Sequence, residues 1–315
     1  MEGVTWVQDA AAQILGVSPG MAGLRAYLPK VGRSRVTVLV TGETGTGKER
    51  VAQAIHALSP RRDKPFLAVN CAAIPEALLE SELFGHERGA FTGAHRASRG
   101  LIGEASGGTL FLDEIGEMSG WAQTKMLRAL ETGEVQPVGG ARPVPTDVRI
   151  IAATNQPLEA LVAQHRFRAD LFYRLNIARV DLPPLRERPE DVPVLFGAAV
   201  SELNRRDGRR VGPPDADLLD CLLAHDWPGN VRELRNLAEA IFIDPPDGAI
   251  RFDHLPPAFG RLFGRYRRMV SVERDRLLDA LRATNWNKTE TAKSLNWSRM
   301  TLYRKLARYN IDHSD

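Results

Sequence analysis

The chain has 315 residues, of which 43% are hydrophobic and 26% charged, the composition of a soluble globular protein with one large domain and something smaller. Its longest apolar runs, such as 36–40 and 150–153, are far shorter than the roughly 18 residues of a membrane span. The N-terminus lacks a secretory signal pattern, and the cysteines, Cys71 and Cys221, lie too far apart for a disulfide framework or zinc cluster. We therefore expect a cytoplasmic protein.

Charge is distributed unevenly along the chain. Residues 261–315 carry 13 Lys and Arg against 6 Asp and Glu, a net charge of +7, whereas residues 1–260 have a net charge of −4. A basic tail with helical patterning is typical of nucleic-acid binding.

Short β-branched runs alternate with helical stretches between residues 36 and 182. The runs are 36–40, 66–70, 109–113, 148–152 and 178–182. Continuous apolar runs of this length, separated by helix-length segments, predict an α/β domain whose parallel sheet is covered on both faces.

The pattern changes at Pro183-Pro184, because proline cannot continue a strand. Residues 190–243 carry only helical signals, and breaker segments follow at 244–248 and 255–257. We predict a short N-terminal extension (1–14), an α/β subdomain (15–184), an all-α subdomain (185–258), a linker (259–271) and a helical C-terminal domain (272–315).

A glycine-rich segment follows the first predicted strand and precedes a helix at 50–58. It fits GxxxxGK, whose backbone N–H groups hold phosphates, and comprises Gly42, Glu43, Thr44, Gly45, Thr46, Gly47, Lys48 and Glu49. Lys48 is expected at the β- and γ-phosphates. Glu49 replaces the usual Ser or Thr at the Mg²⁺ position, where a carboxylate is also a suitable ligand. ATP with Mg²⁺ is the predicted ligand.

Polar side chains end two neighbouring runs of the predicted sheet. The third run stops at Asp113 and Glu114, which beside a P-loop suit Mg²⁺ coordination and polarisation of the attacking water, respectively. Asn155 follows the fourth run, where it could orient the water or serve as a turn residue; taken by itself, the turn is the commoner role.

At this point the chain resembles the AAA+ ATPases that activate sigma-54 RNA polymerase, the NtrC-like bacterial enhancer-binding proteins. The resemblance covers about residues 15–260 and 273–311. Its most specific element is the unbroken GAFTGA loop, Gly89, Ala90, Phe91, Thr92, Gly93 and Ala94. The resemblance implies that this loop contacts sigma-54 in a nucleotide-dependent way, that 15–184 is an AAA+ P-loop core, and that 185–258 is its lid.

Further roles are implied residue by residue. Asn70 matches the asparagine that holds the catalytic glutamate when nucleotide is absent. Arg168 and Arg174 match the arginine fingers, which would stabilise charge at a neighbouring subunit's γ-phosphate; without the resemblance, surface pairing with Asp170 is the commoner role. Arg232 matches the sensor II arginine that faces nucleotide, with Asn230 capping its helix.

The C-terminal domain resembles a Fis-type helix-turn-helix, with helices at 289–295 and 299–309 around a turn at Asn296. The residues expected at double-stranded DNA are Lys288, Ser298, Arg299, Thr301, Arg304, Lys305 and Arg308. Arg299 and Thr301 are assigned to base edges, and Arg304, Lys305 and Arg308 to phosphates. Pairing of two such units predicts an inverted-repeat site upstream of a promoter.

The favoured function is an ATP-driven activator that remodels sigma-54 holoenzyme as a homo-oligomer, a hexamer built from dimers or a heptamer. A hetero-oligomer and a regulator protein in trans stay open. The alternatives are a nucleotide-regulated repressor, against which the intact loop argues, and a general AAA+ remodeller or replication initiator, which would lack both the loop and the tail. About fourteen residues precede the resemblance, so the chain either lacks a sensory domain by nature or is a piece of a longer protein.

Overall fold

A computed structural model describes residues 14–91, 94–309 and 311. Two compact units divide the chain: the first holds residues up to 196 together with 227–236, and the second holds 197–226 and the residues from 237 onward. No helix among the described residues is both long and apolar enough to cross a membrane.

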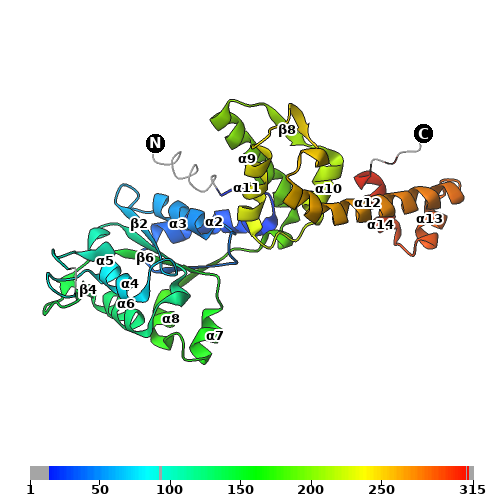
Figure 1. The fold of residues 1–315 in the computed structure, drawn as a ribbon. Coiled ribbons are helices and arrows are strands. Elements are labelled where there is room, and N and C mark those ends of the chain that lie inside the picture. The colour runs from blue at the N-terminus through cyan, green and yellow to red at the C-terminus, as the bar shows by residue number, and fades with distance from the viewer. Residues whose placement is uncertain (1–13, 92–93, 310, 312–315) are drawn as a thin grey trace, which may run out of the picture. The chain divides into compact units, whose positions relative to one another are not determined.

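The first unit is built on a five-stranded sheet with the order β2-β3-β6-β1-β7, in which all neighbouring strands are parallel (Figure 1). The strands are β1 (Val38–Thr41), β2 (Phe66–Asn70), β3 (Thr109–Asp113), β6 (Arg149–Thr154) and β7 (Ala178–Asp181). All residues of the central strand β6 are buried. The α/β prediction is therefore confirmed, and each strand lies within two residues of its predicted bounds.

Helices cover both faces of this sheet. One face packs against α2 (Pro19–Arg33) and α3 (Lys48–Ala57), through buried residues such as Leu28 and Ile55. The other packs against α4 (Glu76–Phe84), α5 (Gly100–Glu104), α6 (Gly120–Thr132), α7 (Leu158–Ala163) and α8 (Ala169–Leu175). Alternation along β1 explains the two layers, because Val38 and Val40 face the first set while Leu39 faces the second.

Short elements complete this unit and lead out of it. They are the 3₁₀ turns η1 (Ile115–Glu117), η2 (Leu185–Glu187) and η3 (Pro189–Asp191), and the antiparallel pair β4 (Glu134–Val135) and β5 (Val144–Pro145). Helices α9 (Val192–Asp207) and α11 (Asn230–Ile241) each contribute residues to both units.

The segment expected to be entirely helical also contains strands. Besides α10 (Ala216–Ala224) and η4 (Phe252–His254), it contains β8 (Val211–Pro214), which pairs in parallel with β9 (Gly248–Ile250). The all-α expectation for 185–258 was wrong in this detail. Both strands are short and rich in Gly or Pro, so neither has the alternating pattern from which a strand is predicted.

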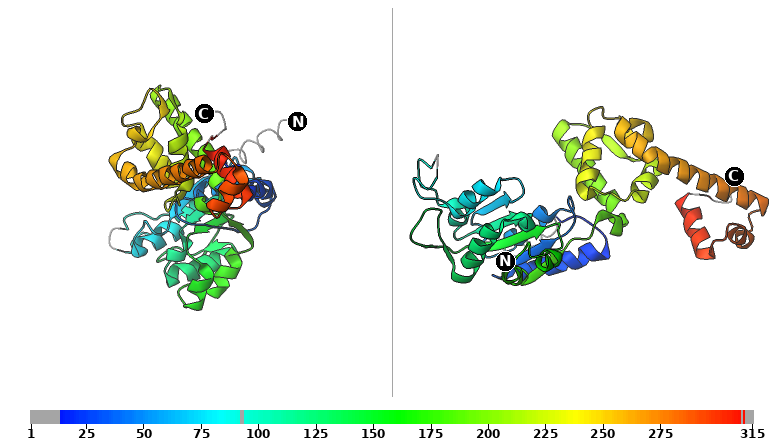
Figure 2. Two further views of the ribbon diagram at one scale, coloured as in Figure 1. Left: turned by 90° about the vertical axis from the view of Figure 1, so that its right-hand side faces the viewer. Right: turned by 60° about the horizontal axis from the view of Figure 1, so that its bottom comes forward.

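Helix α12 (Pro257–Ala283) runs without interruption through residues 259–271, which we expected only as a linker (Figure 2). No proline follows Pro257 in this stretch, so the helix is not broken. Helices α13 (Lys288–Ser294) and α14 (Arg299–Arg308) follow. They pack on the end of α12 through Leu277, Leu281, Ala292, Leu295, Leu302 and Leu306.

Candidate functional site

Lys48 lies at the start of α3 with its ammonium group inside the glycine-rich loop. Its side chain is 7% exposed, and Nζ donates to the carbonyl of Gly42 at 3.0 Å and lies 3.3 Å from Oε1 of Glu114. The loop requires glycine at Gly45, where φ is +82° and a Cβ would lie 2.3 Å from the carbonyl of Gly229. A buried lysine that has only carbonyls and one carboxylate as partners is a suitable phosphate ligand.

Glu114 and Asn155 are linked to the same loop, although they follow different strands. Glu114 has φ of +52°, and its Oε2 accepts a hydrogen bond from the backbone N–H of Asn155 at 3.0 Å. The amide of Asn155 donates to Oγ1 of Thr44 at 2.9 Å. The structure thus brings Lys48, Glu114 and Asn155 together, and Asn155 bridges two strand ends rather than acting only in a turn.

Asp113 lies beside this group and suits a cation. Burial, followed by the negative charge of Glu114, raises the pKa of its carboxyl group above the ordinary value. Glu49 is exposed and accepts a hydrogen bond from Gln53. Within the described ranges no three His, Cys, Asp or Glu side chains form a metal cluster, but nucleotide-bound Mg²⁺ needs only one or two carboxylates besides phosphate oxygens.

Asn70 does not contact the catalytic glutamate in this structure. It pairs with Asp113 in the sheet register, but its side-chain oxygen accepts from the N–H of Ala72 at 2.9 Å. The Glu114 carboxylate is instead bound by Lys48 and Asn155. The switch role of Asn70 therefore stays a prediction.

Contacts that the sequence did not reveal hold the loop from its other side. Glu43 forms a bidentate pair with Arg186, at 2.6 and 2.8 Å, and this pair lowers the pKa of its carboxyl group to about 2. Arg188, which is 2% exposed, donates to the carbonyl of Thr46 at 3.3 Å and pairs with the fully buried Asp191. The sequence signal for these contacts was the cluster of charged residues directly after Pro183-Pro184.

Asn230 does not cap its helix as expected. It is fully buried with φ of +51°, and its side-chain oxygen accepts from the N–H of Leu185 at 2.7 Å. Its amide donates to the carboxylate of Glu43 and the carbonyl of Thr44, each at 3.1 Å. Nearby, the backbone N–H of Arg232 donates to the carbonyl of Gly45 at 3.3 Å, and its side chain is exposed. Arg232 thus borders the nucleotide loop.

The two predicted arginine fingers lie on and next to α8, and both are exposed. Arg168 pairs with Asp170 through two hydrogen bonds of 3.0 and 2.7 Å, the surface pairing that we weighed from sequence. Arg174 donates to the carbonyl of Leu130 at 3.1 Å. Among the described residues, neither arginine contacts the glycine-rich loop of its own chain.

The GAFTGA loop is anchored at its base and presents an aromatic side chain. The N–H of Gly89 donates to the carbonyl of Ala94 at 2.9 Å, and Ala94 is buried. Phe91 is 40% exposed, with its ring centroid 5.0 Å from that of His86. Thr92 and Gly93, also expected at the sigma-54 contact, lie outside the described residues.

The helix-turn-helix has the predicted turn and cap. Asn296 adopts φ of +55°, and Oγ of Ser298 accepts from the N–H of Thr301 at 3.0 Å. Arg299 is exposed, whereas the side chains of Arg304 and Arg308 are outside the described part of the structure.

Lys305, which we expect at a DNA phosphate, is paired with a carboxylate of its own domain. Its ammonium group pairs with Glu273 of α12 and lies 5.1 Å from the ring centroid of Trp297. Only 17% of its side chain is exposed. In this structure Lys305 therefore fastens α14 to α12. Its assignment to a DNA phosphate stays a prediction.

Two exposed side chains on α14 were not among the DNA contacts predicted from the sequence. Met300 is 79% exposed and Tyr303 is 52% exposed, and they lie three residues apart on one helix face. The ammonium group of Lys288 lies 5.4 Å from the ring centroid of Tyr303. The signal available in the sequence was their i, i+3 spacing beside Arg299.

Comparisons with known families cover most of the chain. Residues 14–181 match the Sigma-54 interaction domain, residues 186–262 the AAA+ ATPase lid domain, and residues 269–309 the bacterial regulatory protein Fis family.

Individual relatives agree with these matches. The transcriptional regulatory protein ZraR of Escherichia coli K12 is 45% identical over 301 residues, which are 94% of this chain and 68% of ZraR. The nitrogen fixation protein VnfA of Azotobacter vinelandii is 41% identical over 96% of this chain and 60% of VnfA. The crystal structure of NtrX from Brucella abortus in complex with ADP has a TM-score of 0.75 and 34% identity, and the match covers 96% of this chain and 71% of NtrX.

The range matched to the Sigma-54 interaction domain contains the glycine-rich loop with Lys48 and the acids that end β3. The range matched to the Fis family contains the helix-turn-helix. The chain belongs to the sigma-54-dependent transcriptional activators, which combine an AAA+ ATPase domain with a Fis-type DNA-binding domain.

Proposed function

We propose that this chain hydrolyses ATP with Mg²⁺ and uses the energy to remodel sigma-54 holoenzyme at a promoter. The observation that carries the proposal is the linkage of Lys48, Glu114 and Asn155 around the glycine-rich loop. The same unit carries Phe91 on an anchored, sequence-intact GAFTGA loop. A motor site and a partner-binding loop on one unit are what such an activator needs.

Each residue has a role in this proposal. Lys48 and the loop N–H groups hold the phosphates, and Asp113 with Glu49 would hold Mg²⁺, whose charge draws electrons from the γ-phosphate. Glu114, released from Lys48 when phosphate takes over the ammonium group, orients the attacking water together with Asn155. Arg232 borders the nucleotide. Arg168 and Arg174 bind Asp170 and the carbonyl of Leu130. We propose that they act on the nucleotide of a neighbouring subunit.

The nucleotide part is tested with two variants that separate binding from chemistry. Lys48→Ala removes the phosphate contact and should abolish ATP binding, whereas Glu114→Gln keeps the shape and should bind ATP without hydrolysing it. Fluorescent-nucleotide titration and phosphate release measure the two steps. Equal ATP affinity in wild type and Lys48→Ala would refute the phosphate site.

The output part is tested at the loop. Phe91→Ala and Thr92→Ala should keep most of the ATPase rate, because the loop is separate from the phosphate site in the sequence. Both should lose sigma-54 binding in the presence of a transition-state nucleotide analogue. Retained binding by both variants would show that another surface contacts sigma-54.

We further propose that a homo-oligomer, hexameric or heptameric, binds an inverted-repeat DNA site through paired helix-turn-helix units, in the cytoplasm where RNA polymerase acts. The exposed Arg299 and the capped start of α14 support DNA reading by that helix. Removal of residues 273–315 should abolish specific DNA binding while leaving ATP hydrolysis. The second candidate function, a nucleotide-regulated repressor, is disfavoured by the intact loop at 89–94.

A further inference from the structure

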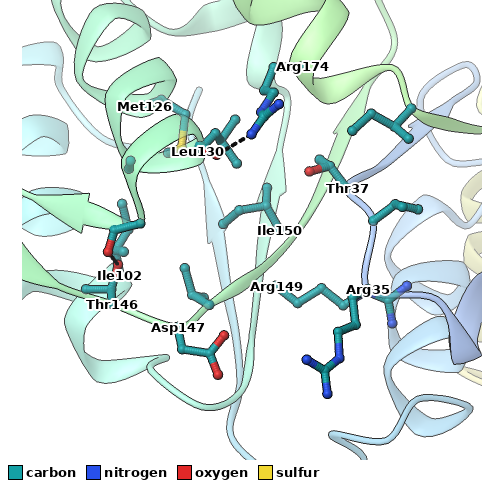
Figure 3. Close-up of a pocket in the computed structure, with 15 residues that line it drawn as sticks. Arg35, Thr37, Ile102, Met126, Leu130, Thr146, Asp147, Arg149, Ile150 and Arg174 are labelled. Atoms are coloured by element: carbon teal, nitrogen blue, oxygen red, sulfur yellow. Dashed lines mark hydrogen bonds between the residues drawn. The ribbon is translucent and has the colours of Figure 1, made fainter.

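A cavity of about 360 Å³ lies at the amino-terminal edge of the sheet, the edge opposite the glycine-rich loop (Figure 3). It opens where β1 and β6 begin, as shown by its lining residues Thr37 and Ile150. The nucleotide loop follows the other end of β1. The cavity is therefore separate from the proposed ATP site, and its volume is within the range of small-molecule pockets.

The floor of the cavity is apolar and its rim is basic. Ile102 and Met126, both fully buried, line the floor with Ile150. Figure 3 shows Arg35 and Arg174 on different sides of the opening. One carboxylate lines the cavity as well, that of Asp147, but it is already paired with Arg61 at 2.5 Å. The rim therefore keeps an excess of positive charge.

Arg149, at the start of β6, also lines the cavity, but its guanidinium is bound to α2. Arg149 is 4% exposed, and its guanidinium donates only to the carbonyls of Gly32 and Val31, at 2.9 and 2.8 Å. Its Nε is buried without a hydrogen-bond partner, and no carboxylate pairs with it among the described residues. Burial, followed by the charge of Arg61, lowers the pKa of Arg149 to about 10. The carbonyls that it binds belong to α2, which does not line the cavity, so Arg149 adds no accessible charge there.

Arg35 supplies the accessible charge. Its side chain is exposed, and within the described ranges it has no hydrogen-bond or ion-pair partner. Among the described residues, Arg174 on the same rim has only the carbonyl of Leu130 as its acceptor. A carboxylate or sulfonate would be a stronger acceptor than that carbonyl for either guanidinium.

We propose that this cavity binds a small organic anion whose apolar body fills the floor and whose acidic group pairs with Arg35 on the rim. An inorganic anion would leave the apolar floor empty, and an uncharged apolar molecule would leave the arginine charges uncompensated. The site lies apart from the glycine-rich loop of its own chain, but Arg174 on its rim is also a proposed finger. A ligand that drew Arg174 away from the Leu130 carbonyl would affect that role as well.

The test uses 8-anilinonaphthalene-1-sulfonate as the anionic probe and N-phenyl-1-naphthylamine as its uncharged counterpart. Both probes are titrated against the full chain, whose ATP site is saturated with a non-hydrolysable ATP analogue. Probe fluorescence gives the affinities. Arg35→Gln should weaken sulfonate binding about tenfold and leave the uncharged probe unaffected. The matched control is Arg33→Gln, an exposed arginine outside the cavity, and it should change neither affinity.

A second variant locates the probe. Ile177→Trp adds bulk at an exposed residue that lines the cavity, so the protein should still fold and both probes should be excluded. Any of four results would overturn the proposal. They are unchanged sulfonate affinity in Arg35→Gln, an equal loss of affinity in Arg33→Gln, undiminished probe binding to Ile177→Trp, and weaker probe binding with the ATP analogue than without it. Inorganic phosphate at the same concentration should not compete, and competition by it would overturn the requirement for an apolar body.

Discussion

Asn230→Ala should loosen the nucleotide loop, because this fully buried side chain joins three segments. Its loss leaves the N–H of Leu185 without its acceptor at 2.7 Å, and removes the donor to Glu43 and Thr44. A buried donor left unpaired costs about 1–3 kcal/mol. Alanine at φ of +51° adds about 1–2 kcal/mol of backbone strain, whereas asparagine tolerates this region.

The glycine variant separates the two contributions. Asn230→Gly also lacks the side chain but accepts the positive φ, so it should be less destabilised than Asn230→Ala by about 1–2 kcal/mol. If about 1–2 kcal/mol of this destabilisation weakens the nucleotide-binding conformation of the glycine-rich loop, ATP affinity falls by a factor of about 5 to 30. Fluorescent-nucleotide titration measures that factor, and hydrogen exchange at 42–47 and 185–187 reports the loosening.

The matched control is Asn236→Ala, an exposed asparagine on the same helix, which should change neither measurement. If Asn230→Ala and Asn230→Gly both bind ATP like wild type and keep wild-type exchange in the two segments, the bridging role of Asn230 is refuted.

Three further predictions follow from the site residues. Lys305→Met should speed hydrogen exchange in α14, because it removes a partly buried ion pair worth about 1–2 kcal/mol. Unchanged exchange, together with a salt slope of DNA binding lower by about one, would show that Lys305 acts at a DNA phosphate and not in fastening α14. Replacing dT by dU in a selected DNA site removes only the thymine methyl group, so it should lower the DNA affinity of the wild type but not that of Met300→Ala. A wild-type affinity that does not change would show that Met300 does not contact a thymine methyl. Mixing Arg168→Ala with Glu114→Gln chains should restore part of the ATPase rate, since some sites would combine an intact finger with an intact acid; no restoration at any mixing ratio would contradict fingers supplied in trans.

Periodicity and motifs predicted the sheet and the phosphate loop well, because both depend on local patterns. The apolar runs ending in Asp113 and Asn155 place these residues at one sheet edge whatever their distant neighbours are. The partners of Asn230 and Lys305 could not be predicted in this way. Their contacts are with Leu185 and Glu273, which lie 45 and 32 residues away in the chain, and nothing in the local sequence specifies such pairs.

The most direct test of the central claim is open-complex formation by sigma-54 holoenzyme on a promoter with an upstream binding site. With the full chain, permanganate footprinting should show strand opening with ATP and no opening with a non-hydrolysable analogue or with Glu114→Gln. Opening that is equally strong without hydrolysable ATP, or none under any condition while sigma-54 binding is intact, would contradict ATP-driven remodelling.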